Sequence, residues 1–156
     1  MSHSPSVHQP LTRVLFVCLG NSCRSQMAEA FARSYGSDVL IAASAGLTPA
    51  SDVAPDTMRS MSDKGLDLRD HFPKSVRQLG RATFDIVINM SGFDLPDGVG
   101  ATTRIWDVPD PVCLKYDEHC AVRDAIERLV MNLILELRRK QTEPQLRPFG
   151  SGRLPL

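Results

Sequence analysis

The chain has 156 residues, and its 18 lysines and arginines are balanced by 18 aspartates and glutamates, so the formal net charge at pH 7 is zero. This length fits one domain with a buried core, and a neutral chain gives no electrostatic reason to expect nucleic acid or an anionic membrane as a partner. No apolar run approaches the roughly 20 residues that cross a bilayer, and the polar start MSHSPSVHQP does not resemble a secretory signal. We therefore expect a cytoplasmic protein whose four cysteines form no structural disulfides and, without paired CxxC spacing, hold no structural zinc.

Strands and helices alternate along the predicted chain. In order, we expect a strand over residues 12–17, a helix over 25–35, a strand over 39–43, a helix over 55–64, strands over 84–90 and 103–106, and a helix over 116–140. Gly36 and Gly65 are placed to end the first two helices. Stretches 1–11 and 141–156 are expected to be flexible tails of a single domain over 12–140. The alternation predicts an α/β fold with a parallel sheet covered on both faces, whose ligands bind beyond the carboxyl ends of the strands.

The stretch CLGNSCRS, residues 18–25, places a thiol where the first strand gives way to the first helix. A thiolate is a strong nucleophile, and Cys18 would have Arg24 and a helix N-terminus nearby to stabilise its charge. Gly20 and Asn21 tolerate the positive φ that a tight loop requires. A free cysteine at a strand end is often only a small buried hydrophobe, but this order of strand, loop, arginine and helix favours a nucleophile.

The loop after Cys18 is predicted to bind an oxyanion. Its backbone N–H groups would form a nest for a tetrahedral anion, and the planar fork of Arg24 would hold two of the oxygens. The predicted oxyanion-binding residues are Leu19, Gly20, Asn21, Ser22, Cys23 and Arg24. The loop differs from a Walker nucleotide loop, because it lacks the Gly-Lys-Ser/Thr ending and carries a nucleophile.

The Cys-x5-Arg-Ser pattern near the N-terminus is similar to the signature loop of the low-molecular-weight protein tyrosine phosphatases and of the arsenate reductases that share their fold. The wording NSCRSQMAE is closer to the reductases. Three further segments follow in family order: SAG at 44–46, the segment from Gly65 to His71 with Lys74-Ser75 after it, and Asp110-Pro111. The resemblance covers about residues 12–140. It implies a three-layer α/β/α, flavodoxin-like fold with a four-stranded parallel sheet, and no metal or organic cofactor.

The resemblance implies catalytic roles for three residues. Cys18 would attack phosphorus, while Arg24 and the loop amides hold the equatorial oxygens. Asp110 would protonate the departing oxygen and then activate water against the phosphocysteine. An aspartate before proline is also an ordinary turn former, and Asp107 is the nearest competitor, although no proline follows it directly.

Other residues would support the site. By the same resemblance, Ser25 would donate a hydrogen bond to the Cys18 thiolate, and Asn21 would hold the loop through hydrogen bonds to Ser44 and His71. His71 has the alternative of a satisfied surface histidine.

Three further cysteines carry weaker expectations. By the same resemblance, Cys23 would form a reversible disulfide with Cys18; the alternative is that it only fills the loop. Cys113 is a second redox candidate because it follows Asp110 closely, and Cys120 is expected to be incidental.

Two departures from the family pattern bear on activity. Thioredoxin-coupled reductases of this fold carry a second cysteine after the third strand, where this chain has Ser91. A reductase would therefore need an external thiol, unless Cys23 or Cys113 substitutes. The phosphatases follow the Asp-Pro pair with tyrosines, where this chain has Val112 and Cys113.

Aromatic residues that could line a phosphotyrosine pocket are few: Phe93, Trp106 and Tyr116. The retained Asp110 favours hydrolysis, so a cysteine-dependent phosphomonoesterase acting on a phosphorylated protein or a small phosphomonoester is the main prediction. The alternative is an arsenate reductase that takes its second thiol from outside. A catalytically silent oxyanion-binding module is disfavoured, because Cys18, Arg24 and Asp110 are all present.

Overall fold

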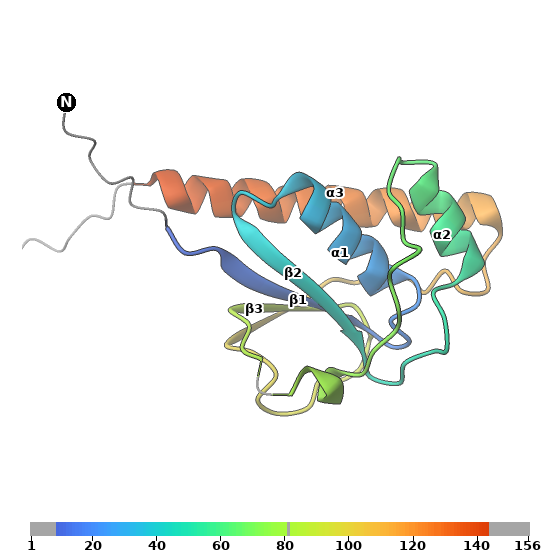
Figure 1. The fold of residues 1–156 in the computed structure, drawn as a ribbon, viewed down its shortest axis with the longest axis horizontal. Coiled ribbons are helices and arrows are strands. Elements are labelled where there is room, and N and C mark those ends of the chain that lie inside the picture. The colour runs from blue at the N-terminus through green and yellow to red at the C-terminus, as the bar shows by residue number, and fades with distance from the viewer. Residues whose placement is uncertain (1–8, 81, 144–156) are drawn as a thin grey trace, which may run out of the picture.

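The computed structural model describes residues 9–80 and 82–143, which contain one four-stranded parallel sheet in the order β2-β1-β3-β4 (Figure 1). The elements are β1 (Thr12–Cys18), α1 (Arg24–Tyr35), β2 (Leu40–Gly46), α2 (Pro55–Ser62), the single-turn 3₁₀ helix η1 (Val76–Leu79), β3 (Ile86–Asn89), β4 (Thr102–Ile105) and α3 (Tyr116–Thr142). The predicted α/β fold with a four-stranded parallel sheet is confirmed. None of the helices in these residues is long and apolar enough to cross a membrane.

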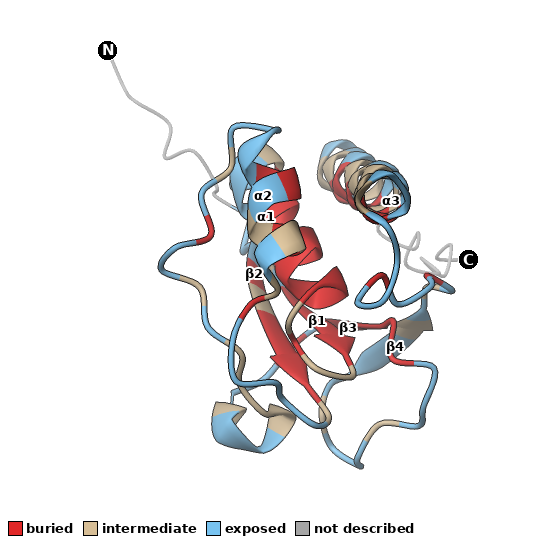
Figure 2. Ribbon diagram, turned by 90° about the vertical axis from the view of Figure 1, so that its right-hand side faces the viewer, coloured by how far each residue is buried: buried red, intermediate tan, exposed pale blue. Residues whose placement is uncertain are grey.

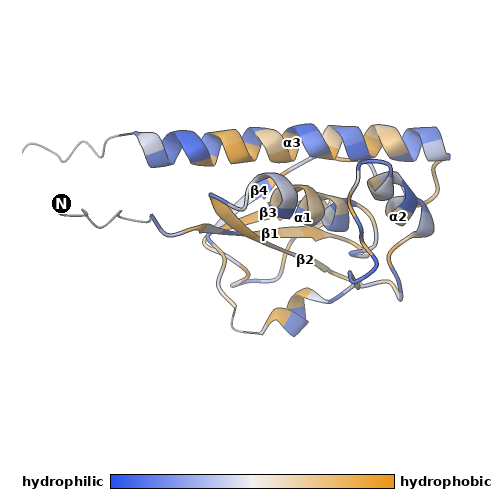
Figure 3. Ribbon diagram, turned by 45° about the horizontal axis from the view of Figure 1, so that its top comes forward, coloured by the Kyte–Doolittle hydropathy of each residue, from blue (hydrophilic) through white to orange (hydrophobic). Residues whose placement is uncertain are grey.

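The central strands β1 and β3 are buried on both faces of the sheet, which explains the unbroken apolar run of β1, whereas the edge strand β4 is largely exposed. Phe16 and Cys18 of β1 belong to the larger core cluster, under the layer of α1, α2 and α3 (Figure 2). Leu15 and Val17 belong to a smaller cluster on the opposite face. That face is covered by η1 and loops rather than by a long helix, so the third layer of the fold is thin. Figure 3 shows the apolar strands and the mixed polar and apolar surface of α3.

Several boundaries differ from the predicted ones for local reasons. The second strand runs on to Gly46, because Gly46 still pairs with Cys18 of β1. The second helix ends at Ser62, and Gly65, with a φ of 75°, serves the chain reversal that follows. The last helix continues through Thr142, so the start of the predicted C-terminal tail is helical. The rest of both predicted tails, 1–8 and 144–156, lies outside the described residues.

Parallel strands bring their carboxyl ends to one edge of the sheet. Cys18 ends β1, and Met90 follows β3 at the same edge, because Met90 N–H donates to the Val17 carbonyl of β1 at 2.7 Å. The segment between β4 and α3 carries Asp110. The topology therefore gathers residues from both halves of the chain beside the loop that follows Cys18.

Candidate active site

Cys18 is buried at the end of β1 and is held by the first turn of α1. Its sulfur lies 2.9 Å from the Ser25 hydroxyl oxygen. Asn21 Nδ2 donates to that same oxygen at 2.7 Å. Because the Ser25 oxygen accepts from Asn21, its proton is free to point at the sulfur, where it would stabilise a thiolate.

Asn21 fixes the loop by using all the hydrogen-bonding capacity of its side chain. It has a left-handed φ of 48°, and its Nδ2 also donates to Ser44 Oγ at 3.0 Å. Its Oδ1 accepts from Gln26 Nε2 at 3.1 Å and from the Lys74 backbone N–H at 3.0 Å. Gly20, the other residue expected to need positive φ, does not have it.

His71 reaches this network indirectly, so the expected hydrogen bond from Asn21 to His71 is wrong. His71 Nδ1 lies 2.9 Å from Gln26 Oε1 and 3.4 Å from Glu29 Oε2. Glu29 also accepts from Ser44 Oγ at 3.1 Å. Sequence reasoning missed Gln26 and Glu29, because they lie on the side of α1 away from its apolar residues, where a helix is expected to be exposed, and only the packing of α1 on all sides buries them.

The backbone carbonyls of the loop that follows Cys18 accept hydrogen bonds from the neighbouring segment of the chain. The carbonyls of Cys18, Leu19 and Gly20 accept from the backbone N–H groups of the chain after β2, and Ser22 accepts from Ala54. Within the part of the chain that the structure describes, no backbone N–H of residues 19–24 donates to a protein acceptor. Those amides are therefore available to an anion, as the sequence predicts.

Gly46 allows the loop to approach the sheet this closely. A Cβ on Gly46 would lie 2.8 Å from the Leu19 carbonyl oxygen and 2.9 Å from the Asn21 nitrogen. The SAG stretch thus contributes twice, through the Ser44 hydroxyl and through the missing side chain at Gly46.

The Arg24 guanidinium is buried and held from two sides. Nη1 donates to the carbonyl oxygens of Met90 and of Val108, the latter at 3.0 Å. Nη2 lies 3.6 Å from Asp110 Oδ2. The other Asp110 oxygen accepts from the Val112 N–H at 3.1 Å. Arg24 is therefore oriented by backbone groups, which leaves its Nη2 side facing the acid.

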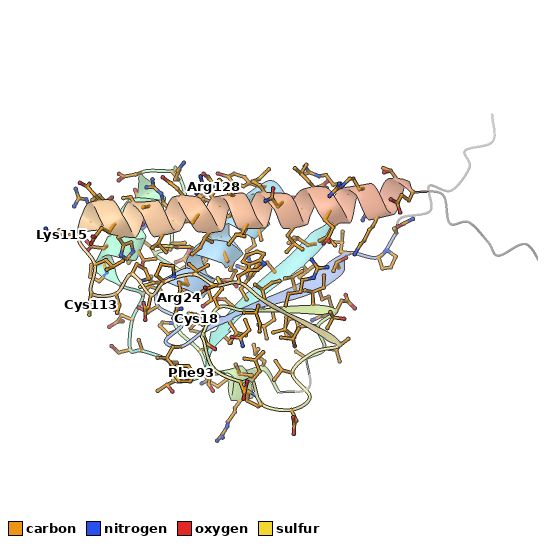
Figure 4. All side chains as sticks on the ribbon, turned by 180° about the vertical axis from the view of Figure 1, so that it is seen from behind. Cys18, Arg24, Phe93, Cys113, Lys115 and Arg128 are labelled. Atoms are coloured by element: carbon orange, nitrogen blue, oxygen red, sulfur yellow. The ribbon has the colours of Figure 1, made fainter. Side chains whose placement is uncertain are left out.

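A cavity of about 270 Å³ opens beside Cys18. Figure 4 labels Cys18 and Arg24, two of its lining residues. Its lining residues are Cys18, Leu19, Gly20, Ser22, Cys23, Arg24, Thr48, Ala50, Asp110 and Val112. Ser25, Ser44 and His71 stand behind the loop instead of lining the cavity. Asp107 does not line it, so the geometry favours Asp110 over its competitor. No aromatic residue is among the lining residues.

The family model for low molecular weight phosphotyrosine protein phosphatases matches residues 13–96. The chain belongs to this family. That confirms the resemblance drawn from the Cys-x5-Arg-Ser loop.

This chain is similar to proteins that are named for different activities. A glutaredoxin arsenate reductase from Synechocystis is 32% identical over 133 residues, which are 81% of this chain and 99% of that protein. A solved structure of an arsenate reductase in the phosphate binding state matches with a TM-score of 0.74 and 30% identity, covering 81% of this chain and 99% of the other. The YwlE arginine phosphatase from Geobacillus stearothermophilus matches with a TM-score of 0.70, covering 88% and 99%, but its 23% identity shows the fold alone.

Cys23 and Cys113 lie in different surroundings. Cys23 caps α1 and lines the cavity. Burial raises the pKa of its thiol, the charges of Asp110 and Cys18 act in the same direction, and a hydrogen bond from Thr57 acts against them. Cys113 is exposed on the segment leading into α3 and does not line the cavity (Figure 4).

Two further positions lie apart from the cavity. Cys120 is half-buried on α3 and does not line it. Ser91 is held in its own turn, where Phe93 N–H donates to its hydroxyl at 3.1 Å and its N–H donates to Asn89 Oδ1 at 2.9 Å. The position of the missing family cysteine is thus filled by a hydroxyl with a local structural role.

Proposed function

We propose that this protein is an arsenate reductase that uses Cys18 and an external small thiol. The observation that carries the proposal is the absence of any aromatic residue among those lining the cavity. A phenyl ring would be held by stacking on an aromatic side chain of the pocket wall, whereas a free tetrahedral oxyanion needs only the loop amides and a guanidinium. The names of the similar proteins support this choice over the phosphatase that was the main prediction.

None of the three aromatic residues that the sequence offers lines the cavity. Trp106 packs against Phe16 at 5.8 Å between ring centroids. The Tyr116 hydroxyl is hydrogen-bonded to Asp63, and its ring lies under a guanidinium. Phe93 is exposed and does not line the cavity.

The proposed reaction begins with attack of the Cys18 thiolate on As(V). The loop amides and Arg24 hold the oxygens, and one oxygen leaves as water with a proton from Asp110. An external thiolate then attacks the Cys18 sulfur, and the S–As bond breaks with its electron pair left on arsenic. The products are arsenite and a mixed disulfide on Cys18, which a second external thiol reduces.

The need for an external thiol follows from the serine at position 91, where the thioredoxin-coupled reductases have a second cysteine. The Ser91 hydroxyl cannot form a disulfide with Cys18. The intramolecular disulfide expected of a thioredoxin-coupled reductase therefore cannot form at this position. Glutaredoxin is the reductant named for one relative. We expect a reductant of the same class to support turnover here.

A phosphomonoesterase is the second candidate, favoured by the position of Asp110. Its carboxylate lines the cavity and lies 3.6 Å from Arg24, where it could serve an alkoxide leaving group as acid and then a water as base. In that reaction the phosphoryl group passes from the ester to Cys18 and then to water.

A parallel assay on one preparation separates the two candidates. Wild type and Cys18→Ser are tested for arsenite release from arsenate, with a glutathione-glutaredoxin system or with thioredoxin, and for hydrolysis of p-nitrophenyl phosphate. We expect Cys18-dependent arsenite release with the small thiol, and Cys113→Ser as a matched control should behave as wild type. Cys18-dependent phosphate release without arsenite would establish the phosphatase instead.

A further inference from the structure

A buried histidine on α3 is hydrogen-bonded to the segment that carries Asp110. His119 is 1% exposed, and its Nδ1 lies 3.3 Å from the carbonyl oxygen of Pro111, the residue that follows Asp110. Its Nε2 lies 3.0 Å from the hydroxyl oxygen of Thr57 on α2, which is fully buried. Neither of the two candidate reactions described above gives these side chains a task.

The partners of His119 determine the direction of each hydrogen bond. A carbonyl oxygen only accepts, so Nδ1 carries a proton and donates to Pro111. In this tautomer of the neutral ring Nε2 is an acceptor, so the Thr57 hydroxyl donates to it. The ring therefore bridges a hydroxyl of one helix and the backbone beside Asp110, and both of its nitrogens have a partner.

The backbone is held by a helix on each side of Asp110. Two residues before it, the carbonyl oxygen of Val108 accepts from Arg24 at 3.0 Å. One residue after it, the carbonyl oxygen of Pro111 accepts from His119. The first contact ties the segment to α1, and the second ties it to α3.

The other hydrogen bonds beside Asp110 lie within its own turn. The Val112 N–H donates to Asp110 Oδ1 at 3.1 Å, and the Leu114 N–H donates to the Pro111 carbonyl at 3.0 Å. These bonds fix the shape of the turn but not its distance from the cavity. The position of the turn therefore depends on its contacts with the helices.

The helix at the other end of the bridge, α2, is tied to the loop that is predicted to bind the oxyanion. The Ala54 N–H, just before α2, donates to the Ser22 carbonyl at 3.2 Å, and the Ser22 hydroxyl donates to the carbonyl of Asp52 at 2.8 Å. α2 also packs against the first turns of α3 (Figure 1). The hydrogen bond between Thr57 and His119 thus relates the segment of Asp110 to the loop on which the oxyanion would lie.

We propose that His119, held by Thr57, is a positioning residue that sets where the Asp110 carboxyl lies at the cavity. It does not line the cavity and acts through the backbone of Pro111. The proposal rests on the proposed function in taking Asp110 as the acid, a role that both candidate reactions share. Proton transfer requires the carboxyl within hydrogen-bond reach of the departing oxygen, and a displacement of about 1 Å can cost on the order of 10²-fold in rate.

The test compares substrates that differ in their need for the acid. Thr57→Val removes the hydroxyl at nearly constant volume, so kcat/KM for arsenate and for an alkyl phosphate should fall by about 10- to 10²-fold. The kcat/KM for p-nitrophenyl phosphate and the inhibition constant of inorganic phosphate should stay near the wild-type values, because the loop amides and Arg24 are unchanged. Thr57→Ser, which keeps the hydroxyl, should restore the wild-type pattern.

A second variant removes the bridge from its middle. His119→Phe keeps an aromatic ring and loses both hydrogen bonds, so it should show the same substrate dependence as Thr57→Val. If His119→Phe fails to fold, the Thr57→Val and Thr57→Ser pair still decides the question. Asp117→Asn, exposed on the first turn of α3, is the matched control and should behave as wild type.

A double-mutant cycle separates the positioning of Asp110 from a general structural role. In the Asp110→Asn background, Thr57→Val should cause no further loss with arsenate or the alkyl phosphate, because the carboxyl that the bridge positions is gone. The same loss in both backgrounds, or an equal loss on every substrate, would overturn the proposal.

Hydrogen exchange gives a readout that does not depend on activity. In Thr57→Val the amides of residues 107–115 should exchange faster than in wild type, whereas those of β1 should exchange at the wild-type rate. Mass spectrometry of peptides from the two segments measures both. Unchanged exchange over 107–115 would show that the bridge does not hold this segment and would overturn the proposal.

The outcomes distinguish this proposal from the proposed function. A wild type that hydrolyses the alkyl phosphate but releases no arsenite would refute the reductase, and a Thr57→Val loss confined to the alkyl phosphate would still support the positioning role. A wild type that releases arsenite, matched by Thr57→Val on every substrate, would overturn the positioning role and leave the reductase intact. A wild type inactive on all of the substrates would refute both.

Discussion

The guanidinium of Arg24 and the carboxylate of Asp110 lie 3.6 Å apart, although they come from the first helix and from the segment before the last one. Arg24 is buried and fixed by backbone carbonyls, whereas the Asp110 side chain is 42% exposed. A rigid cation thus faces an acid that solvent can reach. This suits a group that must exchange protons during turnover.

Asp110→Asn should slow turnover according to the leaving group. Hydroxide from arsenate and alkoxide from an alkyl phosphate need a proton as they depart, so we expect losses of about 10²–10⁴-fold with these substrates. With p-nitrophenyl phosphate, whose leaving group is stable without a proton, the loss should be much smaller. The measurement is kcat for each substrate. Asp107→Asn, exposed on the same segment, is the matched control, and equal losses on all substrates would contradict the assignment.

Arg24→Lys should impair both binding and stability. A lysine offers no planar fork, so turnover should fall by about 10²–10³-fold, as for the loss of an oxyanion donor. The buried carbonyls of Met90 and Val108 would lose their donor, which should lower the free energy of unfolding by about 1–3 kcal/mol. Kinetics and urea unfolding check both values. Arg128→Lys, at an exposed position of α3, should change neither, and unaltered kinetics in Arg24→Lys would remove Arg24 from the site.

Gly46→Ala should displace the loop of residues 19–24, which we propose binds the oxyanion. The added Cβ would lie 2.8 Å from the Leu19 carbonyl oxygen and 2.9 Å from the Asn21 nitrogen, so backbone must move. We expect a loss of about 1–3 kcal/mol in unfolding free energy and weaker phosphate binding by calorimetry. Gly20→Ala is the control for stability, because the nearest atoms to its Cβ are 3.8 Å away. Equal stability of the two variants would mean that the loop tolerates the contact.

Glu29 should make stability depend on acid pH. Burial acts to raise the pKa of Glu29. The hydrogen bond from His71 and the charges of Arg33 and Lys74 outweigh burial, so the pKa lies below its ordinary value of 4.5. A carboxyl of this kind stabilises the fold above its unfolded pKa, and the stabilisation is lost as pH falls through the folded pKa.

Glu29→Gln should therefore be less stable than wild type at pH 7, by about 1–3 kcal/mol, and the difference should shrink as pH falls below about 4. Urea unfolding between pH 3 and 7 measures both trends. Glu136→Gln, which removes the partially exposed pair with Arg104, should cost less than about 1 kcal/mol. A Glu29→Gln deficit that stays constant down to pH 3 would show that the charge of Glu29 plays no part.

The sequence by itself determined the alternation of strands and helices, the parallel sheet and the position of Cys18 at a strand end. These depend on apolar periodicity and on residues close together in the chain, such as the Cys-x5-Arg-Ser loop. The family followed from the same short-range patterns. Even Asp110 could be singled out, because the following proline is local information.

Tertiary structure decided what depends on residues far apart. Gln26 and Glu29 look like ordinary polar residues of a helix until the fold buries them beside Ser44 and His71. The close approach at Gly46 exists only because β2 pairs with β1. The hydrogen bond between Thr57 on α2 and His119 on α3 joins two helices far apart in the chain, and no sequence period reports such a contact. Hydrophobic patterning fixes which face of an element is buried, but the pairing of buried polar groups is set by the packing of whole elements.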